Sequence, residues 1–172
     1  MVSFLLAGLV LLVGLQRLWE LRLARRNRAR SLEAGAREVG AGHYPFFFLL
    51  HGGWLGGWIG EAWSGGPVLS EGWPLWLALF LAAQGLRYWS IRTLGRFWNT
   101  RVLVIPGAPR VQRGPYRFLD HPNYLAVSLE LLSLPFLFEA WRTALLASLG
   151  NGVLLLGFRL PAEEKALSSL GL

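Results

Sequence analysis

The stretch His121–Phe138, "HPNYLAVSLELLSLPFLF", decides how this chain is built. Polar residues open the stretch, and an almost unbroken apolar run follows. Pro122 suits the first position of a helix, because the N–H that proline lacks would have no partner there, and Asp120 or His121 would then be the N-cap. The stretch therefore predicts a long apolar helix that begins at a polar surface.

Similar apolar runs recur along the 172 residues, of which 53% are hydrophobic and 16% charged, with a mean hydropathy of +0.40. With their amphipathic ends, several approach the ~20 residues that cross a bilayer as a helix. We therefore expect a single all-α integral membrane domain over residues 1–172, with about five transmembrane helices. The runs are Met1–Leu15, Pro45–Ile59, Trp73–Gln84, Asn123–Phe138 and Thr143–Phe158.

The distribution of arginine predicts the orientation in the membrane. No basic residue precedes the first run, and "RLARRNRAR" follows it, which is typical of an uncleaved anchor with its N-terminus outside. The connections after the first and third runs are rich in arginine, whereas the other two contain one basic residue, Arg142. The positive-inside rule then places both rich loops and the C-terminus in the cytoplasm, at the inner or plasma membrane. The loop arginines are Arg22, Arg25, Arg26, Arg28, Arg30, Arg37, Arg92, Arg96, Arg101, Arg110, Arg113 and Arg117.

The composition also argues against several kinds of site. A net charge of +7 would also suit a nucleic-acid-binding protein. The arginines, however, lie at the expected membrane surface, where anionic lipid headgroups account for them. The absence of cysteine excludes disulfides and thiolate ligands, and three widely spaced histidines argue against a zinc site. His51, inside the Gly-rich second run, either bonds to a neighbouring helix or lines a pocket.

Two cytoplasmic segments are not ordinary linkers. The connection Arg92–His121 contains "RVLVIPGAP", a β-branched run that ends in a turn signal, and we expect it to fold against the membrane face. After the last run, Pro161 is expected to open a short helix. Glu163 and Glu164 would then lie in its first turn, where the helix dipole favours acids.

Arg159 and Glu163 lie four residues apart at the end of an apolar run. Ionisable groups at such depth are functional candidates, because an arginine there can grip an anionic oxygen and a glutamate can accept hydrogen bonds from an ammonium group or from ribose hydroxyls. The alternative is a simple salt bridge between helix neighbours, with the long side chains reaching toward water. Pro161 lies between the two and weakens the expectation that they share a helix face.

Together, "RGPYRFLDHPNYLAVSLELLSLPF" and "RLPAEEKAL" resemble the isoprenylcysteine carboxyl methyltransferase (ICMT) family. Its members are small integral membrane enzymes that use S-adenosylmethionine, with a GPY…HPxY segment entering one helix and a Glu-Glu pair after the last helix. The resemblance covers about residues 17–167. Within it, "EVGAGHYPFFFLLH" and "LRYWSIRTLGRFWNTRVLVIPGAPRVQRGPYR" resemble a bacterial branch linked to alkylpyrone and phenolic-lipid synthesis.

The resemblance implies methyl transfer from S-adenosylmethionine to a carboxylate, enol or phenol oxygen of a lipophilic substrate from the bilayer, such as an isoprenylcysteine or an alkylpyrone. It assigns methyl transfer and acceptor orientation to Arg159 and Glu163. Two positions depart from the family pattern: Asp120 replaces the usual Arg or Lys, and Ala126 replaces a common Gly. The implied cofactor-binding residues are Tyr116, Arg117, His121, Pro122, Asn123, Tyr124, Glu163 and Glu164.

Two other functions are compatible with the same residues. The C-terminal region of sterol reductases looks similar to this family, so one alternative is a membrane reductase that uses NADPH. The other is a non-catalytic membrane protein whose polar residues only anchor it at the bilayer surface.

Overall fold

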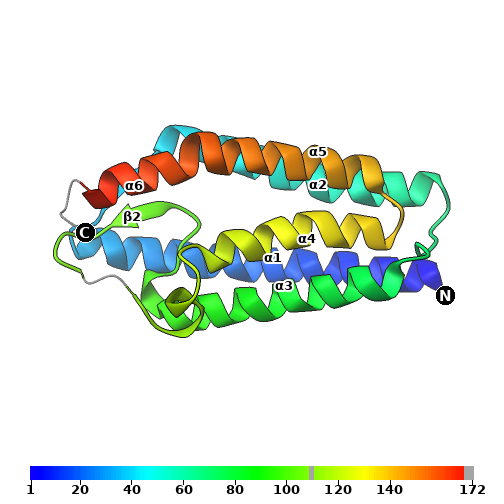
Figure 1. The fold of residues 1–172 in the computed structure, drawn as a ribbon, viewed down its shortest axis with the longest axis horizontal. Coiled ribbons are helices and arrows are strands. Elements are labelled where there is room, and N and C mark those ends of the chain that lie inside the picture. The colour runs from blue at the N-terminus through cyan, green and yellow to red at the C-terminus, as the bar shows by residue number, and fades with distance from the viewer. Residues whose placement is uncertain (109–110, 169–172) are drawn as a thin grey trace.

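The computed structural model describes residues 1–108 and 111–168. Five long helices run through these residues, roughly along the long axis of the molecule (Figure 1). Each contains all or most of one of the apolar runs, so the mostly helical architecture expected from the sequence is confirmed. The helices are α1 (Val2–Glu33), α2 (Tyr44–Ser64), α3 (Trp73–Leu94), α4 (Pro122–Leu137) and α5 (Trp141–Leu154).

Two segments of the described chain are long and apolar enough to cross a membrane by themselves, α1 and the continuous helix Trp141–Ala166. Large apolar side chains are exposed along both, as expected for helices that face lipid. That all five helices cross the bilayer, with the N-terminus outside, stays a prediction. The most exposed apolar side chains on these two segments include Phe4, Leu11, Leu146, Leu149 and Leu156.

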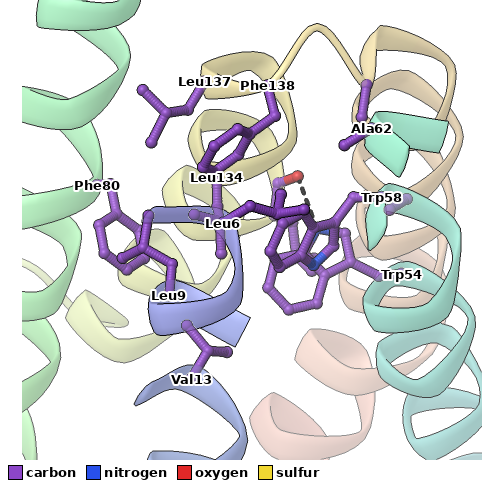
Figure 2. Packing of buried hydrophobic residues seen from close by; sticks show 13 residues of the cluster. Leu6, Leu9, Val13, Trp54, Trp58, Ala62, Phe80, Leu134, Leu137 and Phe138 are labelled. Atoms are coloured by element: carbon purple, nitrogen blue, oxygen red, sulfur yellow. Dashed lines mark hydrogen bonds between the residues drawn. The ribbon is translucent and has the colours of Figure 1, made fainter. Parts of the chain in front are cut away.

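The apolar core lies toward the end of the bundle where α1 begins. Figure 2 shows α1, α2, α3 and α4 contributing side chains to it. The Trp58 ring stacks on Phe138 with 5.9 Å between centroids, and the Trp54 indole N–H donates to the Leu131 carbonyl at 3.1 Å. Large aromatic groups with a satisfied polar atom fix how helices pack, because their shape and hydrogen bond allow few arrangements.

The opposite end is built from connections. Strand β1 (Arg37–Val39) pairs antiparallel with β2 (Val102–Val104), so that Arg37 faces Val104 and Val39 faces Val102. The sheet lies near α6 (Leu160–Ser168), away from the start of α1 (Figure 1). The folded connection after α3 is thus present, but the all-α expectation was incomplete, because β1 forms only by pairing with this connection.

The loop is also fixed to α1. Asn27 is buried, and its amide donates to the carbonyls of Gly95 (3.0 Å) and Trp98 (2.8 Å). On the sheet, the Glu38 carboxylate pairs with Arg28 at 2.9 Å and with Arg101. Arg110 and the last residues of the C-terminal segment, 169–172, lie outside the described residues.

The C-terminal helix continues α5 without a break. Helix α6 begins at Leu160, as expected near Pro161, but it follows a π-helical turn, Leu155–Arg159, rather than a loop. Proline cannot donate a helical hydrogen bond and its ring crowds the preceding turn, so a widened turn accommodates it. The turn brings Arg159 inward, where it is 7% exposed.

Candidate functional site

Arg159 is the centre of the site. Its Nε donates to the Tyr124 hydroxyl at 3.0 Å, and its Nη1 donates to the Thr100 carbonyl at 2.9 Å. The guanidinium also lies over the Phe47 ring, 5.4 Å from the centroid. Contacts from α2, α4 and the loop after α3 therefore hold this cation, and among the contacts described Nη2 makes no hydrogen bond, so it can donate to an oxygen of a ligand.

Tyr124 joins Arg159 to Glu163. The Tyr124 hydroxyl accepts from Arg159 and donates to the Glu163 carboxylate at 2.6 Å. A phenol between a guanidinium and a carboxylate fixes both charges, because each hydrogen bond has an ionised partner. The direct Arg159–Glu163 salt bridge considered from the sequence is replaced in the structure by this hydroxyl bridge.

His121 lies beside the same carboxylate. The second Glu163 oxygen is 4.0 Å from Nδ1 of His121, which is too long for a hydrogen bond, and the His121 ring stacks on Tyr124 with 5.1 Å between centroids. His121 is the residue that precedes α4, with Pro122 at the first helical position, and its side chain makes no capping hydrogen bond. The imidazole therefore lies against Glu163 and Tyr124 and does not cap the N-terminus of α4.

A cavity of about 400 Å³ lies at this end of the bundle, which we call the loop cavity. Seven of the residues implied by the resemblance line it, together with Asp120; Arg117 and Pro122 do not. Arg117 is exposed beside Phe118, and Pro122 is buried at the start of α4. The seven residues are Tyr116, His121, Asn123, Tyr124, Arg159, Glu163 and Glu164.

Tyr116 stays protonated in this cavity. Burial raises the pKa of Tyr116 to about 12, a hydrogen bond with Ser90 opposes that rise, and the negative charge of Glu163 adds to it. The phenol is therefore a hydrogen-bond donor across the physiological range. Burial also lowers the pKa of His43, and the positive charge of Arg159 lowers it further, so His43 adds no second cation beside Arg159.

A second cavity of about 320 Å³, which we call the helix cavity, lies between α1, α2, α4 and α5. Its wall is mostly apolar, with Phe47, Phe48, Leu55, Val127 and Leu155 among its lining residues. Five residues line both cavities and so lie between them: Trp98, Asn99, Asn123, Tyr124 and Arg159. The Arg159–Tyr124 pair thus lies in the wall of both the loop cavity and the helix cavity.

Sequence reasoning missed the partners that lie far away along the chain. Phe47, Trp98 and Thr100 belong to the site; they lie in stretches that resemble the family, but none of them was singled out as a site residue. It also missed a buried ionic network in which Glu130 of α4 pairs with Arg17 at 2.5 Å and with Arg87. The signal was available, because Glu130 lies inside an apolar run, where a charge is costly and needs a partner.

Comparison with known proteins places the chain in a family. The ICMT family, "Isoprenylcysteine carboxyl methyltransferase (ICMT) family", matches residues 76–169. The chain is 39% identical over 159 residues to a Bacillus subtilis (strain 168) protein described as "Uncharacterized protein YpbQ", covering 92% of this chain and 94% of the relative. An uncharacterized Haemophilus influenzae protein (strain ATCC 51907 / DSM 11121 / KW20 / Rd) is 24% identical over 155 residues, 90% of each chain. No solved structure matches. Because the family match covers residues 76–169, more than half of the sequence and most of α3 to α6, the chain belongs to the isoprenylcysteine carboxyl methyltransferase family.

Proposed function

We propose that this protein is a membrane O-methyltransferase that transfers the methyl group of S-adenosylmethionine to an oxygen of a lipophilic acceptor. The observation that carries the proposal is the position of the Arg159–Tyr124–Glu163 unit between two cavities of different character. The loop cavity, rich in polar groups, suits a water-soluble donor, and the helix cavity suits a greasy acceptor. Family membership makes methyl transfer the natural reaction for such a site.

The residues of the loop cavity fit the cofactor. Trp98 Nε1 and Asn123 Oδ1 are buried and have no hydrogen-bond partner among the described residues, so a ligand with polar groups would satisfy them. Glu163 and Glu164 supply negative charge for the ammonium and sulfonium of S-adenosylmethionine or for ribose hydroxyls, and Tyr116 supplies an aromatic surface. When bound, the cofactor supplies an electrophilic methyl group.

The protein's own contribution to the reaction is placement. Arg159 Nη2 would hold the acceptor oxygen as an anion, and the fixed bonds to Tyr124 and Thr100 keep the guanidinium in one orientation. A carboxylate acceptor needs no base. For an enol or phenol acceptor, the Glu163 carboxylate would take the proton, with the Tyr124 hydroxyl holding the carboxylate in place.

The acceptor would enter the helix cavity from the bilayer and lie along Phe48, Leu55 and Val127, with its oxygen at Arg159. An isoprenylcysteine carboxylate and a long-chain alkylpyrone hydroxyl both have this form, a polar head on an apolar chain. The topology that brings cofactor and acceptor together is the one expected from arginine distribution, with the loop cavity facing the cytoplasm.

Binding of S-adenosylhomocysteine to the purified protein in detergent, measured by calorimetry, tests the cofactor. Binding of NADPH instead would support the reductase alternative, and binding of neither would support a non-catalytic protein. Transfer of labelled methyl groups to each lipid class in membranes then identifies the acceptor. We expect Arg159→Ala to lose transfer while it still folds and binds S-adenosylhomocysteine, with a lower Tm because its hydrogen bonds to Tyr124 and Thr100 are lost; full activity would overturn the role given to Arg159. Arg142→Ala, at the far end of the bundle, is the matched control.

A further inference from the structure

The helix cavity is not lined by apolar atoms alone. Three members of the buried ionic network, Arg17 and Glu20 of α1 and Arg87 of α3, form part of its wall. Arg17 pairs with Glu20 at 2.6 Å, and Arg87 pairs with Glu20 at 3.2 Å. The Nε atoms of Arg17 and Arg87 are buried and have no hydrogen-bond partner among the described residues. Each is therefore a hydrogen-bond donor that the network leaves unsatisfied.

Two acceptors lie in the same wall. Asn151 of α5 is 2% exposed; its amide nitrogen donates to the Ser128 hydroxyl at 3.0 Å, while its Oδ1 has no partner within the described chain. His51 of α2 donates from Nδ1 to the Phe47 carbonyl in its own helix at 2.8 Å, which leaves Nε2 as an acceptor. His51 therefore lines a pocket, and its hydrogen bond is within its own helix rather than to a neighbouring one.

The two acceptors, His51 and Asn151, lie at a similar distance along the cavity from Arg159. His51 follows Tyr44 by seven residues along α2, and Asn151 precedes Arg159 by eight residues along α5 and the π turn. At a helical rise of 1.5 Å per residue, both lie roughly 10 Å along the cavity from the end marked by Tyr44 and Arg159. The two acceptors thus lie partway along an otherwise apolar cavity whose wall also contains Arg17 and Arg87, and we call these four residues the polar band.

We infer that the helix cavity is built for an amphiphile whose chain carries a hydroxyl group roughly 10 Å from its polar head. This inference rests on the proposed function in taking the helix cavity as the acceptor site. A buried polar atom without a partner is costly, and a plain hydrocarbon chain would leave Asn151 Oδ1 and the arginine Nε atoms unsatisfied. A chain hydroxyl can accept from an arginine and donate to Asn151 or His51, so it satisfies atoms of both kinds.

The test is competition binding to the purified full-length protein in detergent micelles. Stearic acid and a stearic acid with a mid-chain hydroxyl compete against radiolabelled stearate, so that the carboxylate serves as the head in both. We expect wild type to bind the hydroxylated acid about five- to twentyfold more tightly, the ratio that one such hydrogen bond supplies. Equal binding of the two acids, or binding of neither, would overturn the inference.

Variants locate the preference. His51→Phe combined with Asn151→Leu keeps the cavity wall filled but removes both acceptors, and we expect the two acids to bind it equally. Arg142→Ala, at the far end of the bundle, leaves the cavity wall unchanged and should keep the preference. A preference that survives in the double variant would refute the assignment, and Asn151→Asp, which keeps an acceptor, gives a second readout if the double variant does not fold.

The two proposals fail separately. Fatty-acid binding needs neither cofactor nor turnover, so a chain preference without S-adenosylhomocysteine binding would remove the methyltransferase proposal and keep the polar band. S-adenosylhomocysteine binding without a preference for the hydroxylated acid would keep the methyltransferase proposal and remove the inference about the polar band.

Discussion

Glu130→Gln should destabilise this protein more than any other single loss of a carboxylate in its described part. The side chains of Glu130 and Arg87 are 3% and 2% exposed, and Arg17 donates to both Glu130 oxygens at 2.5 and 2.6 Å. The network of two arginines with Glu20 and Glu130 is neutral, so the substitution leaves one uncompensated buried charge. Removing one partner of a buried ion pair costs about 3–5 kcal/mol.

For a chain of this length, that cost corresponds to a fall in Tm of about 6–20 °C. The assay is thermal unfolding in detergent, followed by circular dichroism, with Glu71→Gln as the control because Glu71 is an exposed acid and should shift stability by less than about 0.5 kcal/mol. A second comparison removes the pair together. Arg87→Met with Glu130→Leu leaves Arg17 paired with Glu20 and should be close to wild type, because replacing a buried pair by apolar groups is often neutral.

A Glu130→Gln protein with the Tm of wild type would refute this reasoning, since it would mean that water reaches the network. A double variant as unstable as Glu130→Gln would refute a different step, the claim that the cost comes from an unpaired charge rather than from lost shape.

Three further outcomes follow from local geometry. Tyr124→Phe removes the hydroxyl between Arg159 and Glu163, and a loss of about 1.5–3 kcal/mol of charged hydrogen bonding predicts a 10- to 100-fold fall in kcat/KM for methyl transfer, checked by initial rates; an unchanged value would remove Tyr124 from the mechanism. Gly114→Ala should destabilise by about 1–3 kcal/mol in thermal unfolding, because Gly114 has φ +58° and a Cβ would collide with the Thr93 side chain; Gly107→Ala, at φ +76° with open space around it, should cost less, and equal costs would argue against the collision. Burial raises the pKa of Glu38, but hydrogen bonds from Arg101 and Arg28 and their charges outweigh it and hold the pKa below its usual value. The Glu38 contribution is therefore complete above the unfolded pKa of about 4.3 and lost as pH falls through the lower folded value, so the stability difference between wild type and Glu38→Gln should be constant from about pH 6 to 8 and shrink below about pH 4; a constant difference down to low pH would show that the ion pairs contribute nothing.

The helices could be predicted because apolar runs of this length have few other structures available. The starts of α3 at Trp73 and α4 at Pro122 were predicted as well, but the end of α1 was not. Helix α1 continues from the run that ends at Leu15 to Glu33, since its later turns are held by Asn27 and by ion pairs to other helices rather than by hydropathy. Strand β1 was not foreseen for the same reason: a three-residue strand forms only with its partner, which lies more than sixty residues away.

The site divides in the same way. The sequence motifs brought His121, Tyr124, Arg159 and Glu163 forward as candidates, and the structure places them together. What the motifs could not provide is the environment of Arg159, because the Thr100 carbonyl is a backbone atom whose position depends on the whole loop. The π turn was also beyond prediction, although Pro161 marked the place where the helix had to change.

The two ends of the bundle are held together by different forces, and the difference follows from the cavities. Where α1 begins, aromatic and aliphatic groups fill the space between helices (Figure 2). Near the site, a cavity of about 320 Å³ takes the place of side chains, and empty apolar volume costs stability that packing cannot recover. Ion pairs hold helices across such a gap, because two or three short contacts fix α1, α3 and α4 without filling it. Since an apolar replacement of the Arg87–Glu130 pair is expected to be about as stable, stability alone does not explain why charges stand there. The remaining explanation is the polarity that these charges give the cavity wall. The variant that combines Arg87→Met with Glu130→Leu should therefore keep its Tm and yet lose part of its preference for the hydroxylated fatty acid.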